Sequence, residues 1–477
     1  MTIQVHANHR YIDEIQSVAQ IFFPHARFGN DRPPEYIISS IIENGKVYGE
    51  IVAGNKTKAV FDLDLEGPGF LNEKRLAMLA MYHLLQDTIG AYAPWGALTG
   101  VRPTKMVREW MANGQSDDEI ISNLQSTLCV HEDRAKLAIT VAHAENRLAD
   151  RINTTNSHTS GAGAPLGLYI SIPFCPSRCV YCSFNTANKP WNEEAQARYI
   201  KAVMAECQEV SNSLRETGNQ ISSVYIGGGT PTALTDYLLE SLLGVIHEIA
   251  TPTEYTVEAG RPDTITHSNL QIMRKHGVNR ISINPQTMND NTLATIGRNH
   301  TTNDFLHAFN MAREEGFTSI NTDVIAGLPG EGPQDMHRTM EALTVLAPEN
   351  ITIHTLAIKR ASRLNEHRAE STLAGYTLPD TKSIEDQLKI AHDCCVEQGL
   401  SPYYLYRQKN MAALFENTGY SLPNHECLYN VGMMSEVQTV LGVGAGAVSK
   451  YIEGNRITRK FNVKNPEIYI ERLHPHI

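Results

Sequence analysis

Short apolar runs alternate with longer amphipathic stretches through the middle of the chain. Six runs rich in β-branched and aromatic residues lie at residues 167–173, 223–229, 255–260, 280–286, 319–327 and 350–358. The stretches between them, such as "LLESLLGVIHEIA", place apolar residues three to four positions apart, which is helical spacing. Such alternation predicts parallel strands joined by right-handed crossovers. We therefore expect an α/β fold built on an incomplete (β/α)6 TIM-like barrel.

The two flanks of this region show other patterns. Upstream, "YIISSIIENGKVYGEIV" predicts a hairpin around Asn44-Gly45, and residues 72–89, 117–128 and 132–151 have helical spacing. Residues 152–165 contain no Lys, Arg, Asp or Glu and are rich in Ser, Thr, Asn and Gly, which is typical of a flexible joint. Downstream lie a helix near 382–399, the aromatic run "PYYLYRQKN" at 402–410, and "LGVGAGAVSKY" at 441–451.

These changes in pattern divide the chain into four parts. We predict an N-terminal α+β and helical domain at 1–151, a linker at 152–165, the partial barrel at 166–375, and a C-terminal extension at 376–477. The role of the N-terminal domain does not follow from its sequence.

Composition restricts the class of protein. The 477 residues are 42% hydrophobic and 19% charged, as in an ordinary globular protein, and the net charge is −11. The absence of long Lys/Arg runs argues against nucleic acid as the main partner. No apolar run approaches the ~18 residues of a membrane span, and the start lacks the pattern of a signal peptide. We expect a cytoplasmic protein with reduced cysteines.

Three of the eight cysteines crowd into "FCPSRCVYCSF", residues 174–184. Their spacing, C-x3-C-x2-C, suits a metal site on a short loop. A structural zinc site takes four ligands, and no fourth cysteine or histidine lies nearby. Three thiolates on an iron–sulfur cubane instead leave one iron open to a substrate or cofactor. A zinc loop or incidental thiols remain the alternative. The other cysteines are interpreted as small buried hydrophobic residues: Cys129, Cys207, Cys394, Cys395 and Cys427.

Polar and glycine residues fall where the predicted strands end. These are Gly227–Gly229, Glu258, Gln286 and Asp323. Because barrels of parallel strands carry their chemistry at the carboxyl ends of the strands, these positions support a functional site there.

The cysteine run resembles the signature of the radical S-adenosylmethionine (SAM) family, with Tyr181 in its aromatic position. The resemblance implies that Cys175, Cys179 and Cys182 hold a [4Fe–4S] cluster whose open iron binds SAM, which is then cleaved to a 5′-deoxyadenosyl radical. It also implies a set of SAM-binding residues, matched position by position in this chain: Tyr181, Gly228, Gly229, Thr230, Glu258, Gln286, Arg298 and Asp323.

Longer stretches are similar to the oxygen-independent coproporphyrinogen III oxidase family, in particular its HemZ-type branch of coproporphyrinogen dehydrogenases. They include "LYISIPFCPSRCVYCSF", "GGGTPTAL", "IGRNHT", "DVIAGLPGE", "PWGALTGVRPTKMV" and "HTLAIKRASRL". The resemblance implies oxidative decarboxylation of two propionates of coproporphyrinogen III, giving protoporphyrinogen IX for haem biosynthesis. It further implies a tetrapyrrole substrate, a C-terminal segment at 376–477 of the oxidase type that binds the tetrapyrrole, an electron-donor protein such as a flavodoxin or ferredoxin, and a catalytic and cofactor-contacting Tyr169.

A substrate with several carboxylates calls for cationic side chains, since guanidinium and ammonium groups pair with carboxylates. The candidates are Arg178, Lys359, Arg360, Arg363 and Arg407. "LGVGAGAVSK" lacks the helix and acidic residue of a dinucleotide site and is interpreted as backbone packed closely against the site. Two positions depart from the family: Ser171 replaces a histidine, and Ser183 replaces the glycine-cysteine of some members.

Three rival interpretations come from other classes. Haem chaperones share the barrel and most of the motifs but deliver haem unchanged. An anaerobic haem-degrading methyltransferase of the same superfamily would consume haem. A structural zinc protein is the third. The N-terminal extension and "PWGALTGVRPTK" favour the dehydrogenase, by analogy with the family.

Overall fold

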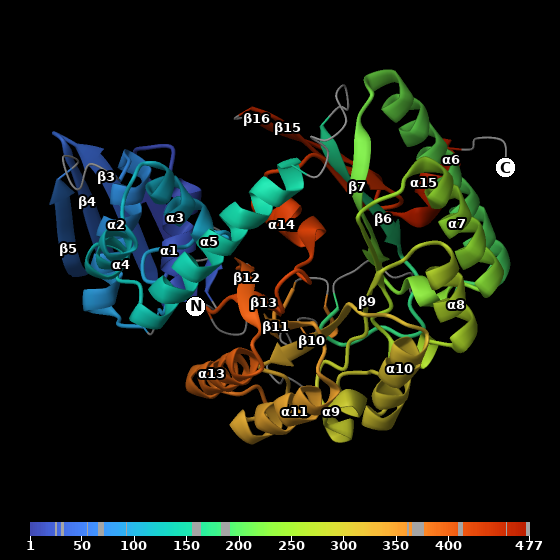
Figure 1. Cartoon of the computed structure of the whole chain (residues 1–477). Coiled ribbons are helices and arrows are strands. Elements are labelled where there is room, and N and C mark those ends of the chain that lie inside the picture. Colours follow the sequence, from blue (N-terminus) through green and yellow to red (C-terminus); the bar gives the residue numbers. More distant parts are fainter. Residues whose placement is uncertain are drawn as a thin grey trace. The chain divides into compact units, whose positions relative to one another are not determined.

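The computed structural model describes the chain except residues 24–25, 30–32, 55, 65–70, 92, 155–163, 183–190, 360–361, 365–375, 409–413, 455 and 474–477. The described residues form two compact units, Met1–Ile139 and Thr140–Ile477 (Figure 1). Helix α5 (Glu132–Thr154) begins in the first unit and ends in the second. The four-part division drawn from the sequence stays a prediction.

The first unit contains a five-stranded sheet of order β2-β1-β3-β4-β5. Strands β3 and β4 form the predicted hairpin, and both turn residues adopt left-handed conformations, with φ of 52° at Asn44 and 74° at Gly45. Helices α1 and α2 pack on each other and on this sheet. The elements are β1 (Thr2–Ala7), α1 (Ile12–Phe22), β2 (Arg27–Phe28), β3 (Tyr36–Glu43), β4 (Lys46–Ala53), β5 (Lys56–Asp64), α2 (Glu73–Thr88), α3 (Pro103–Ala112) and α4 (Asp117–Ser126).

The second unit is built on six parallel strands in sequence order, which confirms the predicted partial barrel. They are β6 (Pro165–Ile172), β7 (Gln220–Gly228), β8 (Glu254–Glu258), β9 (Arg280–Ser282), β10 (Ile320–Ala326) and β11 (Asn350–Thr355). The helices between them are α6 (Glu193–Thr217), α7 (Asp236–Ile249), α8 (His267–Lys275), α9 (Asp290–Thr295), α10 (Thr302–Glu314) and α11 (Pro333–Leu346), with short 3-10 turns at Pro231–Ala233 and Pro262–Thr264.

Local sequence explains these helices. Helix α7 carries apolar side chains at helical spacing, and all of them are fully buried in the core that the helices share with the barrel strands: Leu239, Leu242, Leu243 and Ile246. Helix α6 starts where the Asn192 side chain accepts a hydrogen bond from the backbone N–H of Ala195. It ends at a left-handed glycine.

The C-terminal extension continues the same sheet at both edges. Strand β14 lies parallel to β6, and β13 lies antiparallel to β11, so the sheet has the order β12-β13-β11-β10-β9-β8-β7-β6-β14-β15-β16. Strands of the extension therefore flank the six barrel strands on both sides. Its elements are α13 (Thr381–Glu397), β12 (Ser401–Tyr406), β13 (Asn417–Ser421), α14 (Leu428–Met434), β14 (Val440–Val443), β15 (Val448–Glu453), β16 (Arg456–Phe461) and α15 (Pro466–Leu473).

The glycine-rich turn between β14 and β15 packs against the end of β6. The hydroxyl of Ser171 donates to the carbonyl of Ala445 at 2.9 Å, and the hydroxyl of Tyr199 donates to the carbonyl of Ser171 at 2.7 Å. The Glu206 carboxylate accepts from the backbone N–H of Gly444 at 2.8 Å. The turn is followed by a strand rather than a helix, so close backbone packing is its role, as predicted.

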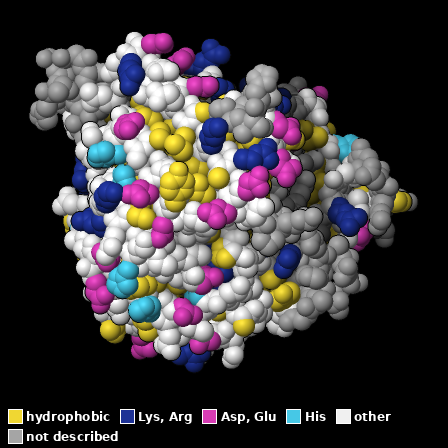
Figure 2. Space-filling model, turned by 90° about the vertical axis from the view of Figure 1, so that its right-hand side faces the viewer, with side chains coloured by type: hydrophobic (Ala, Val, Ile, Leu, Met, Phe, Trp, Pro, Cys, Tyr) yellow, Lys and Arg dark blue, Asp and Glu magenta, His cyan; other side chains and the backbone are white. Residues whose placement is uncertain are grey.

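The distribution of charged side chains on the surface of the described residues agrees with a sequence that lacks long runs of Lys or Arg. Figure 2 shows acidic and basic side chains interspersed over one face, without a continuous basic area. No described helix is long and apolar enough to cross a membrane.

We predict that Gly444→Ala destabilises the protein more than Gly446→Ala. Both glycines have positive φ, 96° and 74°, so each alanine costs about 1–2 kcal/mol of conformational strain. A Cβ on Gly444 would also lie 2.6 Å from the carbonyl oxygen of Ser171, whereas the nearest atom to a Cβ on Gly446 is 3.9 Å away. Urea unfolding of the two variants should show an extra loss of about 1–3 kcal/mol for Gly444→Ala. Equal losses would show that the turn is not held tightly against β6.

Candidate functional site

One cavity of about 390 Å³ opens at the carboxyl ends of the barrel strands. Residues between Cys175 and Lys359 supply most of its wall, and the C-terminal extension supplies the rest, from strand β12, Gln408, Asn417 of β13 and helix α14. It brings together these residues predicted from the sequence: Cys175, Arg178, Cys179, Tyr181, Cys182, Gly228, Gly229, Thr230, Glu258, Gln286, Arg298, Asp323 and Lys359. Segments nearly two hundred residues apart in sequence thus meet at one site, as barrel geometry requires.

The three cysteines lie on the loop that leaves β6. The backbone N–H of Cys182 donates to the carbonyl of Cys179 at 3.1 Å, which turns the loop back on itself. A hydrogen bond of 3.3 Å joins the Cys175 sulfur to the hydroxyl of Thr230. Burial raises the pKa of the Cys175 thiol to about 11, so the metal-free loop carries a protonated thiol there. All three sulfurs belong to residues of the same cavity wall.

The glycine turn after β7 lies directly against the cysteine loop. The backbone N–H of Gly229 donates to the carbonyl of Ile172 at 2.7 Å, and that of Thr230 donates to the carbonyl of Phe174 at 2.6 Å. A Cβ on Gly229 would lie 2.4 Å from the carbonyl oxygen of Phe174. The glycine is required by this close approach of two backbones, and the turn holds the start of the cysteine loop.

Two carboxyl groups line the cavity, and their pKa values are shifted in opposite directions. Burial, and then the negative charge of Asp323, raise the pKa of Glu258 to about 8. Burial also opposes ionisation of Asp323, but His354 and the amide of Asn321, which donates at 2.8 Å, more than offset it and hold the pKa of Asp323 below its usual value. The imidazole of His354 lies 3.6 Å from the Asp323 carboxylate. At neutral pH Asp323 is charged and Glu258 is mostly protonated.

Gln286 and Arg298 present buried polar atoms to the cavity. Arg298 donates to the carbonyl oxygens of Gly260 at 2.5 Å and Asn284 at 2.7 Å, and to the hydroxyl of Tyr181 at 3.3 Å. Within the part of the chain that the structure describes, the Arg298 Nε and the Gln286 Oε1 have no hydrogen-bond partner. Gln286 also adopts a φ of 67°. Unpartnered buried polar atoms and an unusual backbone are typical of a ligand site.

An aromatic wall, formed by Tyr225, Tyr404 and Tyr406, faces the same cavity. Tyr404 and Tyr406 are alternate residues of β12 and therefore lie on one face of the strand. Their rings are nearly parallel, with centroids 6.3 Å apart and an interplanar angle of 8°. Tyr225 stacks on Tyr429 of α14 at 4.7 Å.

Sequence reasoning did not find the aromatic wall, His354 or Arg261, all of which line the cavity. A signal was present for the aromatic wall and for Arg261. "PYYLYRQKN" shows aromatic residues with the period of a strand, and Arg261 directly follows the predicted strand at 255–260. His354 lies in the sixth predicted strand, in a run "HTL" that otherwise reads as buried.

Some predicted residues do not line the cavity. The ring of Tyr169 lies 6.3 Å from Tyr225 and 6.1 Å from Tyr429, so it supports the aromatic wall. Arg363 is exposed. Arg407 is buried and donates to the carbonyl of Leu414 at 3.4 Å, and burial lowers its pKa to about 10. Arg360 and Ser183 lie outside the described residues.

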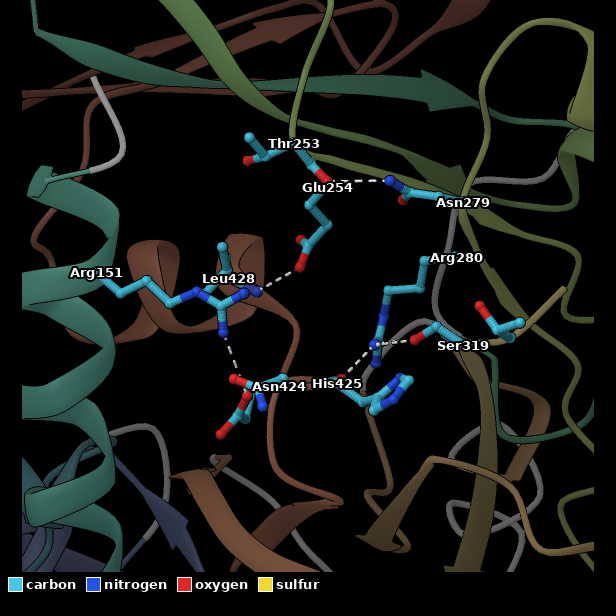
Figure 3. Close-up of a pocket in the computed structure, with 11 residues that line it drawn as sticks. Arg151, Thr253, Glu254, Asn279, Arg280, Ser319, Asn424, His425 and Leu428 are labelled. Atoms are coloured by element: carbon cyan, nitrogen blue, oxygen red, sulfur yellow. Dashed lines mark hydrogen bonds and ion pairs between the residues drawn. The ribbon is translucent and has the colours of Figure 1, made fainter. Parts of the chain in front are cut away.

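A second cavity, of about 300 Å³, lies at the amino-terminal ends of the strands (Figure 3). Its polar groups hold the C-terminal extension in place. The Glu254 carboxylate accepts from the backbone N–H groups of Leu428 at 2.6 Å and Tyr429 at 2.9 Å, and Arg280 donates to the carbonyl of His425 at 2.6 Å. This network fixes helix α14, whose Asn430 and Met434 reach the first cavity.

Comparisons with known proteins agree with this geometry. The profile of the Radical SAM superfamily matches residues 169–343. The chain is 33% identical to the oxygen-independent coproporphyrinogen-III oxidase-like protein HemZ of Bacillus subtilis, over 96% of this chain and 92% of that protein. It is 30% identical to the heme chaperone HemW of Bacillus subtilis, over 64% and 75%. The solved coproporphyrinogen III oxidase HemN from Escherichia coli shares the fold, with a TM-score of 0.53 at 23% identity over 65% of this chain and 70% of that one.

We predict that Glu258 makes the cofactor-free protein less stable as the pH rises. Its carboxyl ionises near pH 4.5 in the unfolded chain and near pH 8 in the folded one. Between these values the folded state binds more protons, so its stability falls with rising pH, by about 1.4 kcal/mol per pH unit at most. Thermal unfolding from pH 5 to 8 should show a flatter dependence for Glu258→Gln than for the wild type. The exposed Glu216→Gln is the control, and parallel curves for all three proteins would contradict the assignment.

Proposed function

The chain belongs to the radical S-adenosylmethionine superfamily and, within it, to the family of the coproporphyrinogen III oxidase-like protein HemZ, and on that basis we propose that it converts coproporphyrinogen III to protoporphyrinogen IX without oxygen. The observation that carries the proposal is the composition of one cavity. It is lined by the three loop cysteines, by buried polar atoms that have no hydrogen-bond partner among the described residues, and by an aromatic wall with nearby cations.

The cavity residues fit the cofactors of the superfamily, a [4Fe–4S] cluster and SAM. Cys175, Cys179 and Cys182 are the cluster ligands. When bound, the two cofactors supply a 5′-deoxyadenosyl radical in exchange for one electron from a donor protein, for which a flavodoxin or ferredoxin is suited.

Binding of SAM falls to the polar groups that line the cavity beside the cysteine loop. Gly228, Gly229 and Thr230 line the cavity beside the cysteines, and the missing side chains of the two glycines let the methionine end of the ligand approach the backbone. The charged Asp323 and the protonated Glu258 offer an acceptor and a donor to ribose hydroxyls, while Gln286 and Arg298 supply further buried polar contacts.

The rest of the cavity suits a tetrapyrrole with carboxylate arms. Pyrrole rings stack favourably on the phenol rings of the aromatic wall. Arg178 and Lys359 line the same cavity and are suited to bind the carboxylates. Burial lowers the pKa of Lys359 while the neighbouring Cys182 acts in the opposite sense, so a bound carboxylate would stabilise its ammonium form. Strand β12 and helix α14 close off part of the cavity from the side of the C-terminal extension.

Each of two propionate arms is converted in the same way. The arm loses a hydrogen atom from its β-carbon, then carbon dioxide and one electron, and a vinyl group remains. The electron passes to an acceptor. The protein holds the β-carbon in position and excludes water from the carbon radical.

A haem chaperone is the second candidate. The similarity to the heme chaperone HemW favours it, but that match covers 64% of the chain against 96% for the HemZ-like protein. A haem-degrading methyltransferase is the third candidate from the sequence. The three functions predict different fates for the tetrapyrrole.

We predict two carbon dioxide losses per substrate when the anaerobically reconstituted protein receives SAM, a reductant, an electron acceptor and coproporphyrinogen III. Mass spectrometry should show protoporphyrinogen IX and 5′-deoxyadenosine, and Cys179→Ala should abolish both because the cluster loses a ligand. An unchanged tetrapyrrole with tight haem binding would instead indicate the chaperone, and consumption of haem with methyl transfer would indicate the methyltransferase.

A variant pair separates substrate binding from cofactor chemistry in the same assay. Lys359→Gln should raise the KM for the tetrapyrrole about tenfold or more, as expected for loss of a charged hydrogen bond of 1.5–3 kcal/mol, while the cluster content stays unchanged. Lys464→Gln, at an exposed position, is the control. An unchanged KM would exclude Lys359 as a carboxylate ligand.

A further inference from the structure

Arg261 reaches from the end of strand β8 to the cysteine loop. Its Nη1 donates to the hydroxyl of Ser177 at 3.0 Å and to the carbonyl of Ser177 at 3.3 Å, and it lies 3.9 Å from the sulfur of Cys179. The opposite edge of the guanidinium forms two bonds of 3.0 Å with the Asp263 carboxylate. This bidentate ion pair fixes the orientation of the guanidinium, so that one N–H group is directed at the loop.

The electrostatic potential that this ion pair produces at the Cys179 sulfur is positive. The guanidinium lies between Asp263 and the sulfur, and is therefore the nearer charge. The Arg261 side chain is 4% exposed and that of Asp263 is 21% exposed. Solvent therefore screens the carboxylate more than the guanidinium. Cys179 is itself buried, so little water lies between the guanidinium and the sulfur.

We propose that Arg261 is a positioning residue that raises the reduction potential of the cluster held by Cys179 and its two partners. Reduction adds one negative charge to a cluster that already carries thiolate ligands. A fixed buried cation and a hydrogen bond to a ligand sulfur both stabilise the more negative state. The proposal rests on the cluster of the superfamily and not on tetrapyrrole chemistry.

The need for such a cation follows from the other charges of the cavity. Asp323 is ionised, and Glu258 becomes ionised at higher pH, and both carboxyl groups disfavour an added electron. Arg298 is buried and close enough to Cys179 to interact with its charge, but it commits two of its bonds to backbone carbonyls. Arg261 directs its Nη1 group at the sulfur of Cys179 from 3.9 Å.

The test is a redox titration of the reconstituted cluster without any tetrapyrrole, followed by electron paramagnetic resonance. Arg261→Gln should lower the equilibrium constant for one-electron reduction about tenfold or more, which corresponds to a midpoint potential lower by at least 59 mV. Iron and sulfide content should match the wild type. Arg198→Gln, which removes an exposed arginine of α6, should leave the potential unchanged. An unchanged potential in Arg261→Gln with a full cluster would overturn the proposal and leave Arg261 as a clamp on the loop.

A second variant keeps the test decisive if Arg261→Gln fails to hold its cluster. Asp263→Asn retains the guanidinium but removes the carboxylate that partly neutralises it, so the potential should rise. A purely mechanical role predicts no rise, and a potential that stays the same or falls would overturn the proposal. Because no tetrapyrrole is present, either result is independent of the decarboxylation proposed above.

Discussion

The close approach of backbones at the carboxyl end of β6 is the constraint on which the site depends. Ile172 and Phe174 accept hydrogen bonds from the glycine turn after β7, and the Gly444 turn approaches Ser171 from the other side. Side chains larger than hydrogen do not fit at Gly229 or Gly444. The cysteine loop begins at this junction, so three segments distant in sequence fix its starting direction.

The electrostatics of the cavity follow from the burial of charged side chains at the carboxyl ends of the barrel strands. The cavity gathers carboxyl groups, guanidinium groups and thiols away from bulk water, where unpaired charges are costly. One carboxyl retains its proton and the other is ionised beside His354. The buried Arg261 and Arg298 would balance the negative charge of thiolates that hold a cluster here. This division of charge prepares the cavity for both a cluster and a cationic ligand such as SAM.

The sequence was sufficient for the features that local pattern encodes. The six barrel strands, the hairpin at Asn44-Gly45 and the cysteine loop were predicted because β-branched runs, turn residues and metal-ligand spacing are local signals. The aromatic wall was not, because the side of β12 that faces the cavity depends on its pairing with β13. The burial of Arg407 and the orientation of Arg261 were missed for a similar reason, since packing partners distant in sequence decide where a long side chain lies.

The measurement that tests the central claim most directly is the electron paramagnetic resonance spectrum of the reduced, reconstituted protein with and without SAM. The account predicts a [4Fe–4S] signal from a cluster held by three cysteines, with g values that shift when SAM is added, because the open iron gains the ligand. A signal that SAM leaves unchanged, or a protein that binds zinc in place of the cluster, would contradict the assignment of this cavity as a radical SAM site.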